Sequence, residues 1–192
     1  MITGVILAGG QSTRMGGNDK GLVELRGIPL YQHVLSRLKN QVDDIIISAN
    51  RNLSAYQQSG YRVVSDIEKG FAGPLAGILT GMQASASEWI VFVPCDVPGL
   101  PLDLVHRLWK EKEGNNAVYV TDGRRDHPTL LLINRCLIEP LKTYLHNGDR
   151  KLMLFIEQIG AKAVSFADQP NAFLNLNSPE DLSNWQRQQN EC

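Results

Sequence analysis

Short, continuous runs of branched and aromatic apolar residues recur along the chain, and such runs are typical of strands buried on both faces of a sheet. The first run ends at Gly9-Gly10, and a later one ends at Pro94, two residues before Asp96. Glycine and proline at these ends indicate that the strands pass directly into loops. The predicted strands are Ile2–Ala8, Ile45–Ile47, Tyr61–Ser65, Trp89–Pro94, Ala117–Thr121, Thr129–Ile133 and Ala163–Phe166.

Between these runs the apolar residues recur three and four positions apart, which indicates helices with one buried face. Pro29 suits a first helical position, and Leu30 and Val34 follow at that spacing. Asn52 and Ser178 are candidate helix N-caps. The predicted helices are Pro29–Asn40, a short one capped by Asn52 and ending at Gln58, Leu75–Ala86, Pro101–Glu111, Leu137–His146, Lys151–Ile159, and a last one with Pro179 at its first position.

The alternation of strands and helices predicts one domain over residues 1–192, of the three-layer α/β/α, Rossmann-like class with a mostly parallel sheet. Asp122-Gly123 is a tight-turn signal, so we expect an antiparallel pair on its two sides. No internal repeat, low-complexity tract or linker interrupts the pattern. In such a fold a ligand is expected at the carboxyl ends of the strands.

The charge balance argues against a nucleic-acid partner. There are 19 basic and 20 acidic residues, a formal charge of −1, and no basic tract. No basic leader precedes the first strand, and no apolar run approaches the roughly 18 residues that a membrane helix needs. The three cysteines are widely spaced without a CxxC pair. We therefore expect a reduced, cytoplasmic protein that does not associate with membranes.

The segment Leu7–Gly21 carries the strongest chemical signal, since it follows the first strand and holds five of the seventeen glycines together with Arg14 and Lys20. Glycine lets backbone N–H groups approach oxyanions, and two cations can bridge a triphosphate. Lys20 precedes Gly21 rather than Ser or Thr, and the GxGxxG order is absent, which argues against an ATPase P-loop and a dinucleotide site. The alternative is a flexible surface loop, but the two cations favour phosphate binding.

Two aspartates follow predicted strands at the edge where a ligand is expected. Asp96 is a candidate Mg²⁺ ligand, because this ion takes one or two carboxylates and completes its shell with water and phosphate oxygens. Asp66 is placed to accept hydrogen bonds from a ribose or from the N1–H and N2–H₂ donors of guanine. The alternative for either residue is a helix cap or a turn former.

Other reactive side chains have simpler interpretations. Cys95 is expected to be a small buried hydrophobe, because no histidine stands beside it in the sequence. His127 is expected in a turn, and the other histidines lie on predicted helices, where structural roles are usual. None of them is assigned to catalysis.

The pattern Leu-Ala-Gly-Gly-x3-Arg-Met-Gly-x2-Asp-Lys, from Leu7 to Lys20, resembles the signature loop of the molybdenum cofactor guanylyltransferases. The first loop and the segment around Asp96 are shared with wider nucleotidyltransferases. The segments that begin at Arg125 and Asn175 make the resemblance specific. The further matching segments are Gly73–Gly77, Pro94–Pro98, Arg125–Pro128 and Asn175–Leu182.

The resemblance implies transfer of GMP from GTP to molybdopterin, with release of pyrophosphate and with Mg²⁺ as cofactor. It implies catalytic roles for Arg14, Lys20 and Asp96, with Asp96 also the metal ligand. The amino-terminal half would bind GTP, and Asn175 and Asn177 in the other half would bind molybdopterin. The implied GTP contacts are Leu7, Ala8, Gly9, Gly10, Lys20, Ser48, Asp66 and Asp96. Ser48 stands where the family often has Asn, so a hydroxyl or backbone group would replace that amide.

Two alternatives remain open from the sequence. One is a related transferase that uses CTP on the same pterin or acts on a sugar or alcohol phosphate. The other is a catalytically silent GTP-binding regulatory protein, against which Arg14, Lys20 and Asp96 together argue, since sensing needs no metal carboxylate. Proteins that deliver molybdopterin, and molybdoenzymes that accept the product, are partners implied by the resemblance alone.

Overall fold

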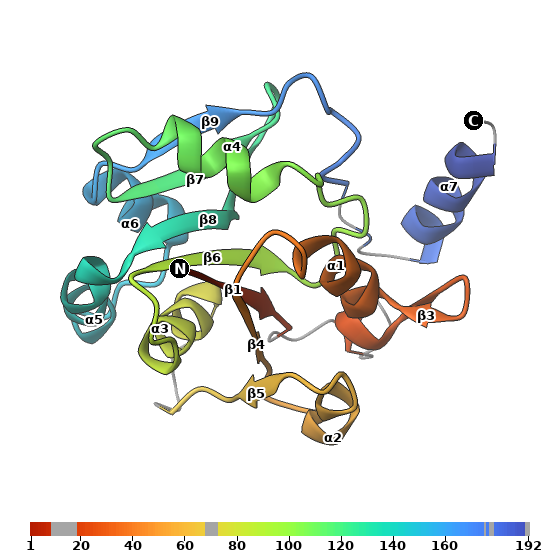
Figure 1. Ribbon diagram of the computed structural model, residues 1–192, viewed down its shortest axis with the longest axis horizontal. Helices are drawn as coiled ribbons and strands as arrows, with labels where there is room; N and C mark the ends of the chain where they lie inside the picture. Colours follow the sequence, from red (N-terminus) through yellow and green to blue (C-terminus); the bar gives the residue numbers. More distant parts are fainter. Residues whose placement is uncertain (9–18, 68–72, 175, 177–178, 191–192) are drawn as a thin grey trace.

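A computed structural model describes residues 1–8, 19–67, 73–174, 176 and 179–190. Its centre is a seven-stranded sheet in which only β8 runs against its neighbours, while the remaining pairs are parallel (Figure 1). In spatial order the strands are β5 (Arg62–Val64), β4 (Asp44–Ser48), β1 (Ile2–Leu7), β6 (Trp89–Pro94), β8 (Asp126–Asn134), β7 (Ala117–Thr121) and β9 (Lys162–Ser165).

Helices cover both faces of the sheet because the strands are apolar on both sides. In β6, Trp89, Val91 and Val93 join one core cluster and Ile90 and Phe92 join the other. The first face is covered by α1 (Leu30–Leu38), α2 (Leu53–Gln57) and α4 (Leu104–Glu111). The second is covered by α3 (Pro74–Ala84), α5 (Ile138–His146) and α6 (Leu152–Gln158). The predicted α/β/α class, with its mostly parallel sheet and antiparallel portion, is confirmed.

A small third cluster lies apart from these two layers. Leu25, Leu30 and Leu176 form its buried centre, with Leu182 and Trp185 packed against them. It joins the last helix, α7 (Pro179–Asn190), to a two-stranded hairpin of β2 (Glu24–Leu25) and β3 (Ile28–Pro29). Two short 3-10 helices, η1 (Lys20–Leu22) and η2 (Arg135–Leu137), complete the elements of the described chain. The sequence did not predict this hairpin, because two residues per strand are too few to show a period.

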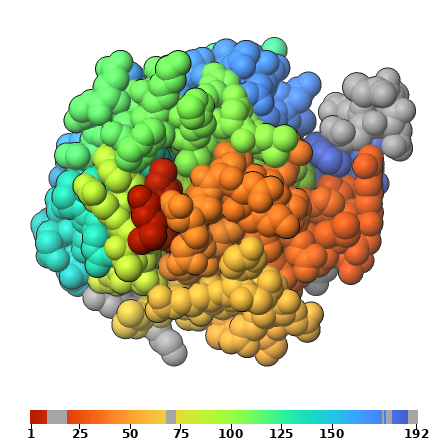
Figure 2. Space-filling view, viewed as in Figure 1, coloured from red at the N-terminus to blue at the C-terminus, as the bar shows by residue number. Residues whose placement is uncertain are grey.

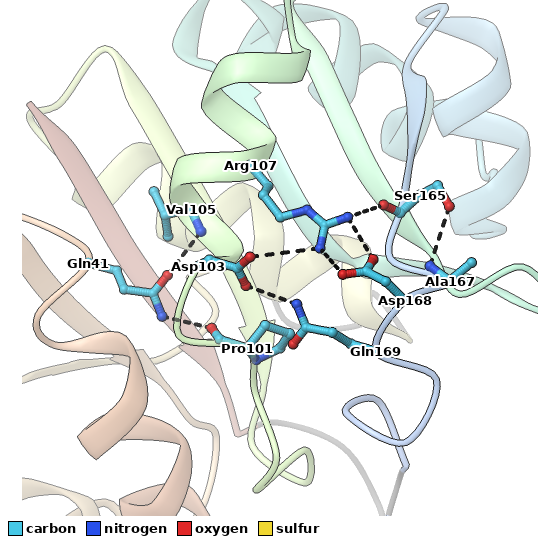
Figure 3. A network of polar contacts seen from close by, with 9 residues as sticks. All are labelled: Gln41, Pro101, Asp103, Val105, Arg107, Ser165, Ala167, Asp168 and Gln169. Carbon is cyan, nitrogen blue, oxygen red and sulfur yellow. Dashed lines mark hydrogen bonds and ion pairs between the residues drawn. The ribbon is translucent and has the colours of Figure 1, made fainter.

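Three local predictions are wrong, and a distant side chain explains the first of them. The helix expected from Pro101 begins at Leu104, and Leu102 is left 67% exposed before it. The amide of Gln41 explains this start: its Nε2 donates to the Pro101 carbonyl at 2.9 Å, and its Oε1 accepts from the Val105 amide at 3.0 Å (Figure 3). A side chain from outside the helix therefore supplies the cap.

Asn52 and His127 provide the other two corrections. Asn52 precedes α2 as expected, but its φ of 53° is left-handed and its side chain makes no capping bond to the helix. His127 lies inside β8 rather than in a turn, because that strand starts at Asp126 instead of Thr129. The turn itself is confined to the Asp122-Gly123 region, where Gly123 has a φ of 88°.

The order of the strands creates a switch point at the middle of the sheet. From β1 the chain moves outward through β4 to β5, and then returns through α3 to β6 on the other side of β1. The strand that follows β1 in the main sheet, β4, and the strand that follows β6, β7, therefore lie on opposite sides of the β1–β6 pair. This is the place where open α/β sheets bind their ligands.

The opposite edge of the sheet is where the chain starts. Met1 is 76% exposed, and Figure 2 shows the first residues, in dark red, at the molecular surface. Within the described residues, we find no helix with the length and apolar character needed to cross a membrane.

Candidate functional site

The carboxyl edge of the sheet brings several predicted residues together. Leu7 and Ala8 end β1, Ser48 ends β4, and Asp66 follows β5. Asp96 follows β6 by two residues. Asp66 and Asp96 are separated by three strand-to-strand steps, which corresponds to about 14 Å at the usual ~4.8 Å spacing. The two carboxylates therefore lie at opposite ends of a strip across the switch point.

Asp96 is buried, and it faces a cation. Its side chain is 12% exposed, and its Oδ2 lies 3.9 Å from the Nζ of Lys20, which is 32% exposed. Burial raises the pKa of Asp96 above its usual value, while the charge of Lys20 and a backbone hydrogen bond oppose that rise. A buried carboxylate beside a half-exposed ammonium suits an ion or a phosphate that both groups can share.

Asp19 positions Lys20, a role that the sequence did not reveal. The Asp19 side chain accepts hydrogen bonds from the Gly21 amide at 3.2 Å, the Tyr56 hydroxyl at 2.6 Å and the Asn52 amide at 3.3 Å. It thereby caps η1, the turn that carries Lys20. An aspartate ahead of a turn signals a cap, but the two partners on or beside α2 are more than thirty positions away.

Gly21 completes this arrangement by its lack of a side chain. A Cβ atom at this position would lie 2.5 Å from the hydroxyl oxygen of Tyr56, which is too close for any real contact. The glycine therefore allows Tyr56 to reach Asp19. This requirement is spatial, since Gly21 does not have a positive φ.

Asp66 has a polar setting of its own at the far end of the strip. Its backbone N–H donates to the Asn50 Oδ1 at 3.0 Å, and its Oδ2 accepts from the Asn50 Nδ2 at 2.9 Å. Its other oxygen accepts from the Thr80 hydroxyl at 3.1 Å. Asn50 and Thr80 thus fix the carboxylate in one orientation at partial exposure.

Ser48, Leu7 and Ala8 contribute mainly through the backbone of the sheet. The Ala8 amide donates to the Ser48 carbonyl at 2.8 Å, and the Leu7 carbonyl accepts from the Cys95 amide at 3.2 Å. Ser48 is only 3% exposed, and a Cβ at Gly77 of α3 would lie 3.4 Å from its hydroxyl oxygen. The Ser48 side chain is therefore covered by α3.

Several predicted residues lie outside the described part of the chain. These are Arg14, Gly9, Gly10, Asn175 and Asn177. Leu176, which lies between the two asparagines, is 1% exposed and donates its amide hydrogen to the Asp96 carbonyl at 3.3 Å. The carboxyl-terminal segment is therefore anchored directly beside Asp96.

His127 and Cys95 have structural surroundings, as expected. The Nε2 of His127 lies 2.7 Å from the Oδ2 of Asp122, and its ring stacks on Phe173 at 5.4 Å. Cys95 is buried, and burial raises the pKa of its thiol well above the usual value, which keeps it protonated. Cys136 is a free, exposed thiol. Among the described residues, no group of three or more His, Cys, Asp or Glu side chains gathers to form a metal cage.

Comparison with known sequences gives a consistent family. Residues 4–163 match the family model described as a MobA-like NTP transferase domain. A molybdenum cofactor guanylyltransferase of Serratia proteamaculans (strain 568) is 54% identical over 187 residues, which cover 97% of this chain and 95% of that protein. A protein of the same name from Yersinia pestis (strain Pestoides F) is 52% identical over 186 residues, with the same coverage.

Solved structures share the fold at much lower identity. Molybdopterin-guanine dinucleotide biosynthesis protein A of Archaeoglobus fulgidus has a TM-score of 0.81 at 21% identity, and the match covers 99% of this chain and 100% of that one. A 4-diphosphocytidyl-2C-methyl-D-erythritol synthase of Anaerococcus prevotii has a TM-score of 0.79 at 14% identity, with coverages of 98% and 96%. At these identities the likeness concerns the arrangement of the chain alone.

Proposed function

Because the chain belongs to the MobA-like NTP transferase family, we propose that it transfers GMP from GTP to the terminal phosphate of molybdopterin and releases pyrophosphate. Relatives that are 52 and 54% identical over 97% of the chain carry the name molybdenum cofactor guanylyltransferase. The single observation that carries the proposal is the pairing of Lys20 with the buried Asp96 at the switch point.

The strip from Asp66 to Asp96 suits a nucleoside triphosphate. Asp66 would accept donors from the guanine base or the ribose at one end, with Asn50 and Thr80 holding it in place. Lys20, together with Arg14 and the glycines of the first loop, would hold the phosphates at the other end. The backbone of Leu7 and Ala8 would line the middle, and buried Ser48 would act through its main chain.

Asp96 fits the role of a Mg²⁺ ligand. This ion is held in proteins by one or two carboxylates together with phosphate oxygens and water, and Asp96 keeps Oδ1 besides the oxygen that faces Lys20. When bound, Mg²⁺ would neutralise charge on the phosphate oxygens. Because its pKa is raised, the Asp96 carboxylate becomes ionised, and so able to bind Mg²⁺, only above the pH range in which an ordinary aspartate titrates.

The reaction would then be a direct, in-line displacement. An oxygen of the molybdopterin phosphate attacks the α-phosphorus of GTP, a new P–O bond forms, and the bond to the β-phosphate oxygen breaks to release pyrophosphate. No covalent enzyme intermediate is needed. Lys20 and Arg14 would stabilise the charge that builds on the leaving pyrophosphate, so positioning and electrostatics provide most of the rate.

Asn175 and Asn177 would contact the pterin. The amide of their neighbour Leu176 donates a hydrogen bond to the Asp96 carbonyl, and this contact supports the assignment. The amino-terminal half of residues 1–192 would thus bind the donor and the other half the acceptor. A cytoplasmic location and contacts with proteins that supply molybdopterin or receive the product are parts of the same proposal.

Pyrophosphate release from protein incubated with Mg²⁺, GTP and molybdopterin tests the function. We expect release that depends on all three additions and on GTP rather than CTP or ATP. Lys20→Ala and Asp96→Ala should each slow it by about 10²-fold or more, because each removes a charge that stabilises the transition state. As a matched control, Lys110→Ala removes an exposed lysine charge and should leave the rate unchanged.

The alternatives predict different results. Release with CTP, or with a sugar phosphate in place of molybdopterin, would assign the chain to another transferase. Tight GTP binding without release would favour a regulatory protein. A folded Asp96→Ala variant with normal turnover would remove Asp96 from the mechanism.

A further inference from the structure

The turn between β7 and β8 carries two arginines that the proposed mechanism does not use. Arg124 and Arg125 are both exposed. In the part of the chain that the structure describes, neither guanidinium forms an ion pair or a hydrogen bond with another side chain. Arg125 also opens the Arg125–Pro128 segment, one of the segments that made the sequence resemblance specific.

This turn lies at the same edge of the sheet as Asp96. Since β8 is antiparallel to both β6 and β7, the end of β7 points in the direction of the end of β6. In Figure 1, β6 and β9 both point to the side on which α7 lies. The turn is separated from the end of β6 by two strand-to-strand steps, about 10 Å. It flanks the site on the side away from Asp66.

A short stretch of chain connects the turn to Asp96. Phe173 stacks on His127 near the turn, and Leu176, three residues later, donates to the Asp96 carbonyl. Three residues of extended chain span at most about 10 Å. Phe173, beside His127, and Leu176, beside Asp96, therefore lie no more than about 10 Å apart.

The turn is held in place by Asp122. Its Oδ1 accepts hydrogen bonds from the amides of Arg124 and Arg125, both at 2.8 Å, and its Oδ2 faces His127. The hydrogen bond with His127, above all, lowers the pKa of Asp122 to about 2, so the carboxylate stays ionised in this role. Both of its oxygens are therefore occupied by backbone and imidazole, and neither is paired with an arginine side chain.

We infer that Arg124 and Arg125 bind the anionic ene-dithiolate end of molybdopterin, beyond the phosphate that receives GMP. The inference rests on the proposed function, which places the nucleotide over β5, β4 and β1 and leaves the side of β8 and β7 for the acceptor. Guanidinium groups offer several donors in a fixed plane and suit an anion with two neighbouring acceptor atoms. These arginines are binding residues for the second substrate and do not contact GTP.

Steady-state kinetics of the full chain, followed by pyrophosphate release, tests this assignment. Arg124→Ala and Arg125→Ala should each raise the KM for molybdopterin by about tenfold, the value of one hydrogen bond to a charged group. The KM for GTP and kcat should stay near wild type. Arg125→Lys should recover part of the loss because it keeps the charge, and Lys110→Ala at the other edge should change nothing.

A simple alkyl phosphomonoester serves as a probe of the acceptor phosphate alone. It should inhibit the wild type and both arginine variants equally, because it lacks the sulfur atoms. Weaker inhibition of the variants would mean that the arginines bind phosphate, and unchanged KM for molybdopterin in folded, active variants would equally overturn the inference. Absence of pyrophosphate release by the wild type would instead refute the proposed function.

Discussion

Asp96, the proposed metal ligand, is a buried charge that the fold must accommodate. Its carboxylate is buried beside one lysine, and burial raises its pKa above the value in the unfolded chain. The folded protein therefore holds this proton to a higher pH than the unfolded chain does. The stability associated with protonated Asp96 is present below the ordinary pKa of about 4 and is lost as the pH rises through the raised value.

Asp96→Asn should therefore separate activity from stability. At pH 7 we expect a higher free energy of unfolding in urea than for the wild type, because the buried charge is gone, while turnover falls by about 10²-fold or more. The stability difference should vanish as the pH approaches about 4, where the wild-type carboxylate is itself protonated. A variant that is less stable at pH 7 would show that the Asp96 charge holds the fold together.

At the same scale, the sequence singled out Lys20 and Asp96, which the structure brings together, but not the groups that hold them. Lys20 was identifiable as a cation of the glycine-rich segment after the first strand, and Asp96 as a carboxylate two residues after a buried strand. Asp19 depends on Tyr56 and Asn52, which approach it only after α2 has packed on the sheet. Asp122 likewise acquires its role from the fold of the β7–β8 turn. Such positioning contacts have no sequence period and cannot be inferred from spacing.

Among the elements, α4 is attached to the edge strand β9 in large part through Arg107. Arg107 makes a bidentate pair with Asp168 at 2.9 and 3.0 Å and donates to the Ser165 carbonyl at 2.6 Å (Figure 3). Its guanidinium lies 4.0 Å from the ring centroid of buried Phe166. This contact joins α4 to β9 and to the segment that leads toward Leu176.

Replacement of Arg107 should loosen this attachment. Arg107→Lys keeps the charge but loses the planar fork, so we expect the free energy of unfolding to fall by about 1 kcal/mol, a value kept small because Asp168 is 62% exposed. Arg107→Ala should lose slightly more. Urea unfolding measures both, with Lys110→Ala on the same helix as a control that should stay within about 0.5 kcal/mol. Equal stability of Arg107→Lys and wild type would contradict this account.

Strands were predicted more accurately than helix ends, for a physical reason. A strand such as Trp89–Pro94 is defined by its own continuous apolar run, and the structure reproduces its bounds. The start of α4 instead depends on Gln41, which lies more than sixty positions earlier. The hairpin of β2 and β3 depends on contact with α7. These two limits are set by distant partners, whereas β8 starts at Asp126, three residues before its apolar run.

At the scale of the whole molecule, the two main cores and the small third cluster differ greatly in size. The main clusters line the two faces of one sheet, whereas Leu25, Leu30 and Leu176 form a satellite. The family match ends at residue 163, before Leu176 and α7. Leu176, which lies between the two asparagines proposed to contact the pterin, therefore belongs to the smallest of the three cores.

The small size of this third cluster predicts that the protein loses activity on heating before its sheet unfolds. Parts of a protein with few buried apolar contacts open at lower free energy than its central strands. Warming should thus release Leu176 from the Asp96 carbonyl while the sheet is still intact. Pyrophosphate release assayed at each temperature should be lost at a lower temperature than the circular dichroism signal of the sheet, and coincident midpoints would disprove it. Inactivation would then be the undocking of a tail rather than the melting of an enzyme.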